Sequence, residues 1–533
     1  MTAVAPSSLR KDRRDTPPFR RVLIANRGEI AVRIIRACRE LGIETVAVHS
    51  SADTAAMHVR LADESILIGD ASATASYLRG DAVVAAALAT GAEAIHPGYG
   101  FLAERASFAK AVEDAGLVFV GPPSGVIAAL GDKLAARRGA AAAGVPVVPG
   151  TFEAAAIDRP DAVESIVAEA EHIGFPLLVK AAAGGGGKGM RRVMRAADLP
   201  AALAAGSAEA HSAFGDGSVY LERVIHPARH VEVQLLGDRE GTIVALGERD
   251  CSLQRRHQKL VEEAPAPGLN PAERRDLHAT AVRAARAAGL ENAATAEFLL
   301  DPERRFWFLE VNTRLQVEHG VTELVTDVDI VREQLWIAAG FPLSDEVRAA
   351  ADRAAEPARH AFEVRLSTED PAREFAPAPG TIGRWEMPSG PGIRIDTAVE
   401  PGARIPPDYD PLIAKLLVVD ATRDAALDRL ARALDETGID GIQTTLPFHR
   451  FIARDQAFRA GPLTIDWVDE NWPAVAASRR SASLDIALHA AAAAAAAPTA
   501  DRAAGRPSET SDSGGSSAWA RAGRLRAIER SPR

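Results

Sequence analysis

Residues 306–319 read Phe-Trp-Phe-Leu-Glu-Val-Asn-Thr-Arg-Leu-Gln-Val-Glu-His, an apolar run that passes directly into a polar segment. Because side chains alternate between the two faces of a strand, Glu310 and Asn312 share one face. A second strand pattern, Thr-Ala-Glu-Phe-Leu-Leu, carries Glu297. Two carboxylates and an amide oxygen form a hard oxygen set, which suits Mg²⁺ (or Mn²⁺) bridged to nucleotide phosphates. Ion pairs with buried arginines are the alternative explanation.

The polar segment after Asn312 predicts a change of direction. A straight strand of eight residues would span about 26 Å, which is too long for one small site, so the chain must bend after Asn312. A bent loop carrying Arg314, Gln316 and Glu318 beside a metal offers a cation for a small anion and a carboxylate base. Solvated loop charges are the alternative.

A glycine-rich stretch at 180–190 reads Lys-Ala-Ala-Ala-Gly-Gly-Gly-Gly-Lys-Gly-Met and follows the apolar run 176–179. Consecutive glycines let the backbone approach an anion closely and turn its N–H groups toward it. With a lysine on each side, the stretch is predicted to close over phosphates as a lid. A flexible linker is the alternative for a glycine run taken alone.

Two further segments are less decisive. The run 249–259, Arg-Asp-Cys-Ser-Leu-Gln-Arg-Arg-His-Gln-Lys, is polar and basic, and alone it is equally typical of a solvated face. The turn 96–101, His-Pro-Gly-Tyr-Gly-Phe, is interpreted as structural. Lysine is scarce, with seven residues against 55 arginines. Because arginine is so strongly preferred, a lysine indicates a position that suits a compact ammonium group and not the planar guanidinium group of arginine. Chance and codon bias are the alternative explanation.

Bulk properties limit the class of protein. The chain has 533 residues, a formal net charge of −10 and two cysteines, Cys38 and Cys251. This length predicts two to four subdomains. The acidic balance argues against a nucleic-acid partner, and two distant cysteines fit a reducing cytoplasm rather than a disulfide framework. No apolar run approaches the roughly 18 residues that span a bilayer, so no membrane association is expected.

The order of patterns predicts several domains. Residues 21–50 show a strand–helix–strand pattern without a GxGxxG fingerprint, and short strands follow at 94–96 and 118–120. The first domain is therefore expected to end near residue 132. Alternating strands and helices continue to about 345.

Beyond this block, 358–468 combines short strands with a helical stretch at 424–437. The two ends differ in composition from the rest. Residues 1–18 are predicted to be a disordered leader. The Ala/Ser/Gly-rich tail, 476–533, is predicted to be largely disordered because it has few apolar residues to bury.

Together these motifs resemble the biotin carboxylase family of the ATP-grasp superfamily over about residues 20–468. The resemblance rests on segments that occur in order: Ile24-Ala-Asn-Arg-Gly-Glu-Ile-Ala31, the turn at 96–101, the glycine loop, the run 249–259, residues 310–319, Glu363-Val-Arg-Leu-Ser-Thr-Glu-Asp370 and Tyr409-Asp-Pro-Leu-Ile-Ala-Lys415. It implies an α/β (α+β) architecture. This comprises a Rossmann-like N-terminal domain (19–132), an ATP-grasp domain with a mobile lid (133–345, lid about 150–225) and a C-terminal β-rich domain (358–468).

The resemblance also implies roles for single residues. Lys133 and Lys180 would hold ATP phosphates, with Gly186 and Gly187 in the lid. Adenine would meet Glu222, Arg223, Val224 and Ile225. The ribose and phosphates would be surrounded by His230, Gln254 and His257. The metal would be bound by Glu297, Glu310 and Asn312.

At the reacting end, the resemblance implies that bicarbonate is held by Lys259, Arg314, Gln316 and the Val317 backbone. Glu318 would be the general base, and Arg365 would face the ureido group of biotin. The implied activity is that of a ligase, which carboxylates biotin with ATP and bicarbonate through carboxyphosphate, as in acetyl-CoA carboxylase. This is the first half-reaction of a biotin-dependent carboxylase.

No lysine is followed by Met, so the Met-Lys-Met context of biotin attachment is absent from the sequence. We therefore expect a separate biotin carboxyl carrier protein and a separate carboxyltransferase, and the resemblance implies a homodimer. The final carboxyl acceptor stays open. A carbamoyl-phosphate synthetase is one alternative, although no internal repeat is found, and a catalytically weak scaffolding paralogue is another.

Three segments depart from the family pattern. Gly320 stands where proline is usual, which predicts a looser loop around the base. Ala103-Glu-Arg stands after the 96–101 turn where Ser-Glu-Asn is usual, and Asp327 replaces a glycine. None of them removes a residue with an implied role.

Overall fold

The structure is a computed structural model that describes residues 16–157, 160–182 and 190–479. The chain divides into two compact units, Met1–Ala477 and Ser478–Arg533, and the fold below is that of the first. The leader up to residue 15, the predicted tail from 480 and the lid glycines Gly186 and Gly187 lie outside the described residues. Within the described part, no helix is both long and apolar enough to cross a membrane.

The N-terminal part is a parallel five-stranded sheet in the order β3-β2-β1-β4-β5. Its strands are β1 (Arg21–Ile24), β2 (Glu44–Ser50), β3 (Glu64–Gly69), β4 (Ala94–His96) and β5 (Val118–Phe119). Its helices are α1 (Gly28–Glu40), α2 (Met57–Leu61), α3 (Gly80–Thr90), α4 (Ala106–Asp114), α5 (Ser124–Gly131) and α6 (Lys133–Ala142), with short 3₁₀ turns η1 (Ser51–Asp53) and η2 (Ala73–Ala75). The predicted strand–helix–strand opening is confirmed.

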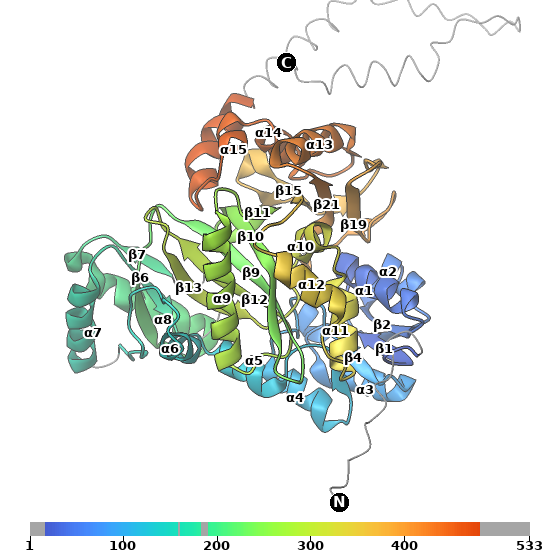
Figure 1. Cartoon of the computed structure of the whole chain (residues 1–533), viewed down its shortest axis with the longest axis horizontal. Helices are drawn as coiled ribbons and strands as arrows, with labels where there is room; N and C mark the ends of the chain where they lie inside the picture. Colours follow the sequence, from blue (N-terminus) through green and yellow to red (C-terminus); the bar gives the residue numbers. More distant parts are fainter. Residues whose placement is uncertain (1–15, 158–159, 183–189, 480–533) are drawn as a thin grey trace, which may run out of the picture. The chain divides into compact units, whose positions relative to one another are not determined.

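A small layer follows in the chain, at the left in Figure 1, and contains the three-stranded sheet β7-β6-β8. Its elements are α7 (Pro160–Ile173), β6 (Leu177–Ala181), β7 (Arg191–Val193), η3 (Ala196–Asp198), α8 (Leu199–Phe214) and β8 (Val219–Arg223). Alternate residues of β6, Leu177 and Val179, are fully buried and pack with Leu203 of α8. The opposite face of β6 therefore presents Lys180.

The centre is an antiparallel eight-stranded sheet in the order β13-β12-β9-β10-β11-β14-β21-β19. Its strands are β9 (Arg229–Gly237), β10 (Ile243–Arg255), β11 (Gln258–Ala264), β12 (Asn292–Leu300), β13 (Phe306–Asn312), β14 (His360–Ser367), β19 (Ile393–Thr397) and β21 (Leu412–Asp420). Because β11 pairs with β14, the sheet runs without interruption from the predicted ATP-grasp segment into the predicted C-terminal segment.

Helices cover this sheet, and Figure 1 shows α9 lying along it. They are α9 (Pro271–Ala287), α10 (His319–Thr326), α11 (Ile330–Ala338), α12 (Asp345–Arg353), α13 (Arg423–Glu436), α14 (Leu446–Ile452) and α15 (Gln456–Ala460). Two-residue strands and one 3₁₀ turn complete the C-terminal part: β15 (Glu369–Asp370), η4 (Pro371–Arg373), β16 (Ala376–Pro377), β17 (Gly380–Thr381), β18 (Trp385–Glu386), β20 (Arg404–Ile405) and β22 (Gly438–Ile439). A further helix begins at residue 467 and buries Trp472 and Ala476.

Helix α10 is held at the junction of the N-terminal and central sheets by a buried carboxylate. Glu323 accepts a bond of 2.9 Å from Arg33 of α1 and one of 2.7 Å from Arg394 of β19. Burial alone would raise the pKa of Glu323, but the charges of Arg33, His319 and Arg394 outweigh burial and lower it to about 2. The carboxylate is therefore charged at neutral pH.

We expect Glu323→Gln to lower the free energy of unfolding by about 3 kcal/mol at neutral pH. The pKa of this group is depressed by folding, so its stabilisation is present above about 4.5 and is lost as the pH falls toward about 2. Thermal unfolding of the variant and the unmodified chain should thus differ most at neutral pH and converge in acid. Glu400→Gln, in an exposed pair with Arg60, is the control and should change little. A pH-independent difference would contradict this account.

Candidate active site

The predicted metal residues lie on neighbouring strands. Glu297 of β12 stands directly opposite Glu310 of β13. Like charges at opposed positions repel each other, and burial together with the charge of Glu297 raises the pKa of Glu310. The Asn312 amide lies beside them and donates to Glu297 at 2.8 Å. A buried and a half-buried carboxylate with an amide at one point fit a hard divalent cation such as Mg²⁺, which would supply a counter-charge for Glu310.

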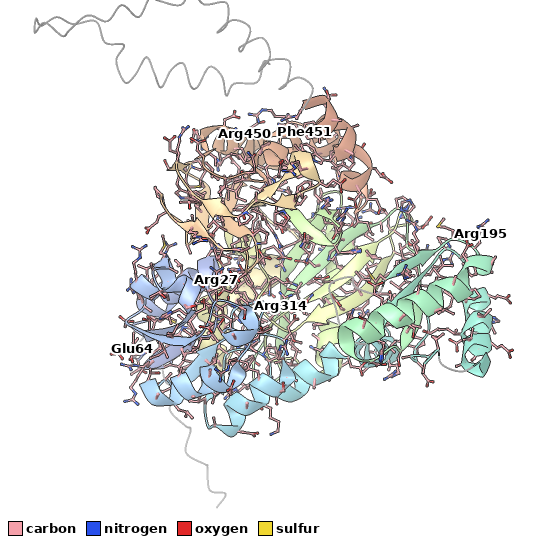
Figure 2. The ribbon with its side chains drawn as sticks, turned by 180° about the vertical axis from the view of Figure 1, so that it is seen from behind. Arg27, Glu64, Arg195, Arg314, Arg450 and Phe451 are labelled. Atoms are coloured by element: carbon pink, nitrogen blue, oxygen red, sulfur yellow. The ribbon has the colours of Figure 1, made fainter. Side chains whose placement is uncertain are left out.

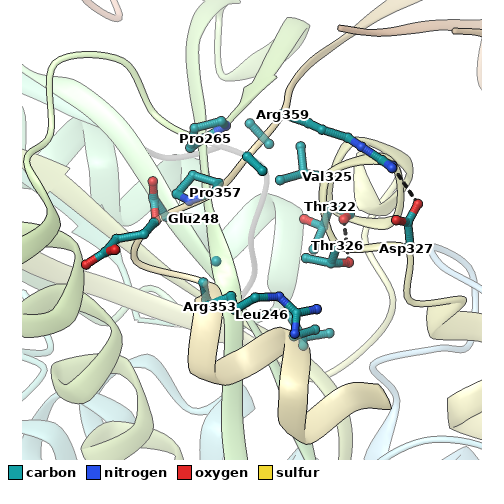
Figure 3. A pocket seen from close by; sticks show the side chains of 16 residues that line it. Leu246, Glu248, Pro265, Thr322, Val325, Thr326, Asp327, Arg353, Pro357 and Arg359 are labelled. Atoms are coloured by element: carbon teal, nitrogen blue, oxygen red, sulfur yellow. Dashed lines mark hydrogen bonds and ion pairs between the residues drawn. The ribbon is translucent and has the colours of Figure 1, made fainter. Parts of the chain in front are cut away.

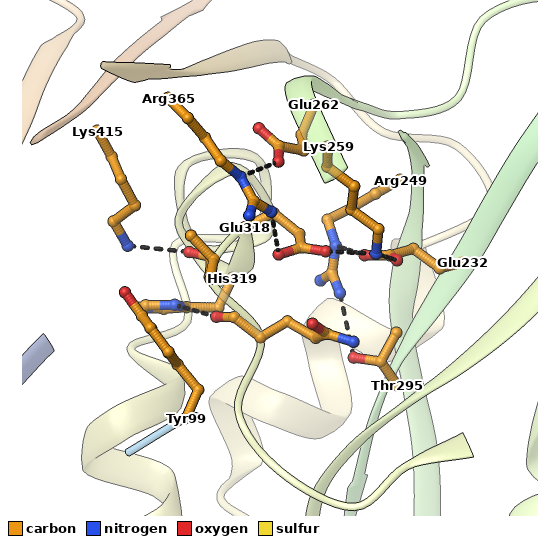
Figure 4. Close-up of polar contacts among 12 residues, drawn as sticks. Tyr99, Glu232, Arg249, Lys259, Glu262, Thr295, Glu318, His319, Arg365 and Lys415 are labelled. Carbon is orange, nitrogen blue, oxygen red and sulfur yellow. Dashed lines mark hydrogen bonds and ion pairs between the residues drawn. The ribbon is translucent and has the colours of Figure 1, made fainter. Parts of the chain in front are cut away.

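Lys259 of β11 lies at the centre of the site (Figure 4). Its ammonium is 2.5 Å from Glu232, 2.7 Å from Glu318 and 3.2 Å from Glu297. Burial would lower the pKa of Lys259, but the three carboxylates outweigh burial and raise it well above the ordinary value. One fixed cation therefore holds together carboxylates from β9, β12 and the start of α10.

Glu318 occupies the position immediately before α10. The chain leaves β13 at Asn312 and enters the helix at His319, so the predicted bend is confirmed. One Glu318 oxygen accepts from Lys259 and the other accepts from Arg365 at 3.0 Å. Burial would raise the pKa of Glu318, but Lys259 and Arg365 more than offset this and lower it. The group is a buried, ionised carboxylate, which is the form that a base requires.

The segment between strand and helix collects further polar groups. Arg314 donates to Gln316 at 2.9 Å and pairs with Glu104 at 2.9 Å, and Figure 2 shows Arg314 away from the rim of the molecule. Gln316 donates to Glu297 at 3.3 Å. The Val317 carbonyl accepts from Lys415 at 2.9 Å. The structure thus brings together all the predicted bicarbonate residues with the metal residues.

The predicted nucleotide residues form a second group. Lys180 of β6 pairs with Glu222 of β8 at 2.7 Å, and the other Glu222 oxygen accepts from Arg137 at 2.9 Å. Lys133 opens α6 close by, where burial lowers its pKa. After Glu222, the backbone N–H groups of the next two residues bond Pro149 and Pro176. Ile225 follows directly, at the end of the segment predicted to meet adenine.

His230, a predicted nucleotide residue, lies beside the metal residues. Its Nε2 lies 3.1 Å from Glu297. Burial would lower the pKa of His230, but the Glu297 and Glu232 carboxylates together outweigh burial and raise it to about 9. Gln254 is buried on β10, whereas His257 lies exposed in the β10–β11 turn. His257 therefore lies at the rim of the site rather than within it.

Arg249 excludes the solvated-face alternative for the start of the run 249–259. The run is a hairpin of the central sheet, and Arg249 is fully buried. It donates to Glu232 at 2.6 Å and also to Gln234, Thr295 and Thr322. Arg249 is thus a structural cation of the site, because each of the three nitrogens of its guanidinium group donates to a neighbouring side chain.

Sequence reasoning missed Glu232, Glu262 and Lys415 as parts of the site. Glu232 had a visible signal, since His230, Glu232 and Gln234 alternate along β9 and so share a face. Glu262 accepts from Arg365 at 2.6 Å, and Lys415 is fully buried beside Val317. Their partners come from distant segments, so no local pattern indicates them.

A cavity of about 180 Å³ lies away from these residues, between β10, α10 and α12 (Figure 3). Thr322 of α10 contributes to its wall, and an Arg359–Asp327 pair of 2.7 Å lies at its edge. None of the predicted site residues lines it. The catalytic geometry is therefore separate from this cavity.

Comparison with known families agrees with this arrangement. Residues 132–346 match the family model for the ATP-binding domain of the carbamoyl-phosphate synthase L chain, which gives the class of the central domain as nucleotide-binding. Residues 18–127 and 363–470 match the models for the biotin carboxylase N-terminal and C-terminal domains. The chain therefore belongs to the biotin carboxylase family, and the resemblance inferred from the motifs is confirmed.

Individual relatives are similar over most of the chain. "Biotin carboxylase" of Pseudomonas aeruginosa is 49% identical over 450 residues, which are 84% of this chain and 98% of that protein. "Biotin carboxylase 1" of Bacillus subtilis is 47% identical, over 85% and 98%. The biotin carboxylase domain dimer of Hydrogenobacter thermophilus 2-oxoglutarate carboxylase, solved with MgADP, ADP and bicarbonate, has a TM-score of 0.80 and 44% identity, over 85% and 97%. The Campylobacter jejuni biotin carboxylase structure has a TM-score of 0.80 and 40% identity, over 85% and 99%.

Gly320 is tightly packed, so the predicted looser loop is wrong. The residue is buried in the first turn of α10. A Cβ atom there would lie 2.4 Å from Cδ2 of Leu417 and 3.2 Å from Oε2 of Glu363. Leu417 is itself fully buried, so it has little room to withdraw. The glycine lets the helix that carries Glu318 approach the sheet closely.

We expect Gly320→Ala to destabilise the protein by about 1–3 kcal/mol, because the added methyl overpacks against Leu417. Thermal unfolding measures the change. Gly139→Ala is a matched control, since Gly139 is exposed on helix α6 with open space around it and alanine there should stabilise slightly. A double variant with Leu417→Val should recover part of the loss. Equal stability of Gly320→Ala and the unmodified chain would show that the close contact is not a constraint.

Proposed function

We propose that this chain carboxylates biotin on a separate carrier protein, with MgATP and bicarbonate as co-substrates. The observation that carries the proposal is the ionised Glu318, held between Lys259 and Arg365 at one end of the Glu297–Glu310 pair. A base, an anion-binding cation and a metal-binding pair at one place fit phosphoryl transfer to a small acidic nucleophile. The solved relative that holds MgADP and bicarbonate supports the same chemistry.

In the first step, bicarbonate would lie against Lys259, Arg314, Gln316 and the Val317 backbone. Glu318 takes the bicarbonate proton, and the freed oxygen attacks the γ-phosphorus of ATP, whose bond to ADP breaks. Lys133 and Lys180 would stabilise the charge that spreads over the transferred group. Glu297, Glu310 and Asn312 would hold Mg²⁺, which would neutralise charge on the phosphates of ATP. The product is carboxyphosphate.

In the second step, carboxyphosphate breaks into CO2 and phosphate. The phosphate accepts the N1 proton of biotin, and the nitrogen then attacks CO2 to give carboxybiotin. Arg365 would stabilise the negative ureido oxygen that forms on the way. Exclusion of water protects the intermediate from hydrolysis, a role that fits the predicted glycine-rich lid.

The partners follow from the same proposal. A carrier protein would bring biotin, and a carboxyltransferase would pass the carboxyl group on, in the cytoplasm. A homodimer is proposed with support from the related structure described as a dimer. We also propose domains at 19–132, 133–345 and 358–468. One relative, from Methanothermobacter thermautotrophicus, is named as a pyruvate carboxylase subunit, and the Hydrogenobacter thermophilus structure is part of a 2-oxoglutarate carboxylase, so the acceptor differs among relatives.

The direct test measures phosphate release from MgATP by the purified chain, with and without bicarbonate and free biotin. Release that requires bicarbonate and rises with biotin is expected. Release that is indifferent to both would contradict the proposal and leave another ATP-dependent ligase or an inactive scaffold.

The variant Glu318→Gln tests the proposed role of Glu318 as the general base. The amide keeps the shape but cannot accept the proton, so we expect bicarbonate-dependent phosphate release to fall by about 10²–10⁴-fold. Glu400→Gln, on the exposed surface, is the control for the substitution itself and should retain full turnover. Unchanged turnover in Glu318→Gln would remove Glu318 from the role of base.

A further inference from the structure

Two buried carboxyl groups face each other behind Arg365. Glu262 of β11 and Glu363 of β14 are opposed in the antiparallel register, which places their Cβ atoms about 5 Å apart. Both side chains are fully buried. An opposed pair of this kind, shielded from solvent, cannot keep two negative charges without compensation.

The available cations do not provide that compensation. One oxygen of Glu262 accepts from Arg365, but its other oxygen and both oxygens of Glu363 have no hydrogen-bond partner among the described residues. Lys415 of β21 attracts Glu363, but it is already shared by Val317, Glu29 and Asp396. Lys259 attracts Glu262, but its ammonium is already paired with three other carboxylates. Arg365 is itself shared, because it also pairs with Glu318.

The remaining surroundings of Glu363 also disfavour a second charge. Gly320 and the apolar Leu417 lie on its α10 and β21 side. Glu318 adds a further negative charge from the start of α10. Burial, with a contribution from Glu318, raises the pKa of Glu262 to about 7, and burial and Glu262 raise that of Glu363 well above the ordinary value. The pair therefore keeps a proton at pH values at which an ordinary carboxylic acid is ionised, and that proton belongs to both groups.

We propose that Glu363 is a positioning residue, which shares a proton with Glu262 and thereby sets how strongly Glu262 retains Arg365. With one proton, the pair carries a single negative charge, and Arg365 divides its bonds between Glu262 and Glu318. Without the proton, the pair carries two charges and draws Arg365 away from Glu318 and from the ureido group of biotin. This inference rests on the proposed function, because it concerns the arginine assigned to biotin.

The consequence is a pH dependence of the KM for biotin. In the unmodified chain, KM for biotin should rise with pH once the pair begins to lose its last proton. Above the pKa of that proton, the rise should approach about tenfold per pH unit. Glu363→Gln replaces the protonated acid with a neutral group of the same shape, so the pair keeps a single charge. KM for biotin should then stay constant over the same range.

The experiment measures biotin-dependent phosphate release from MgATP and bicarbonate in the full chain, as a function of free biotin concentration and pH. A flat KM profile in Glu363→Gln, beside a rising profile in the unmodified chain, supports the proposal. The same rise in both proteins overturns it. Absence of any bicarbonate- and biotin-dependent release in the unmodified chain is a different result, since it defeats the proposed function itself.

Glu363→Asp provides a second variant in case the glutamine variant does not fold. It keeps an ionisable acid but withdraws it from Glu262 by one methylene, which weakens the interaction between the two groups. The rise in KM for biotin should persist and move to a different pH. A profile that coincides with that of the unmodified chain would overturn the proposal, because a role in packing alone would not move the pH of this transition.

Discussion

The site depends on the ion pairing of one lysine with three buried carboxylates. Removing several charges from water is costly, and their mutual attraction compensates only when each has close partners. Lys259 meets this condition by reaching Glu232, Glu297 and Glu318 within 3.2 Å. The backbone must therefore bring β9, β11, β12 and the start of α10 to one point, and the continuous central sheet is the scaffold that does so.

The central sheet also explains why the site contains residues from more than one of the domains predicted from the sequence. The pairing of β11 with β14 joins the nucleotide-binding segment to the C-terminal segment, so Lys259 and Arg365 lie on neighbouring strands although they are about a hundred positions apart. Arg365 and Glu262 can bond only because of this register. The two halves of the proposed reaction, activation of bicarbonate and transfer to biotin, thus share one rigid surface through Glu318.

Sequence patterns predicted what is local. Alternation along 306–312 placed Glu310 and Asn312 on one face, chain length required the bend before Glu318, and glycine and lysine composition indicated the phosphate loop. Burial and pairing between distant strands were beyond the same reasoning. Arg249 is indistinguishable in sequence from a solvated arginine until β9 and β12 surround it. Gly320 suggested looseness, but its neighbour Leu417 lies nearly a hundred residues further along and makes the position tight.

Helix α10 gives the molecule a mechanical property. It is eight residues long, about 12 Å, with Glu318 at one end and Glu323 gripped by Arg33 and Arg394 in its body. Glu318 lies five residues from Glu323, about 7.5 Å along the axis, so a tilt of about 8° about Glu323 would move it by about 1 Å, which is enough to break a hydrogen bond. Glu323, which is held by its two ion pairs, is the fixed point about which the helix would tilt. Selection for turnover would therefore also act on Arg33 of α1. This residue lies outside the candidate site, and it would be selected only because it fixes the position of Glu318 through Glu323.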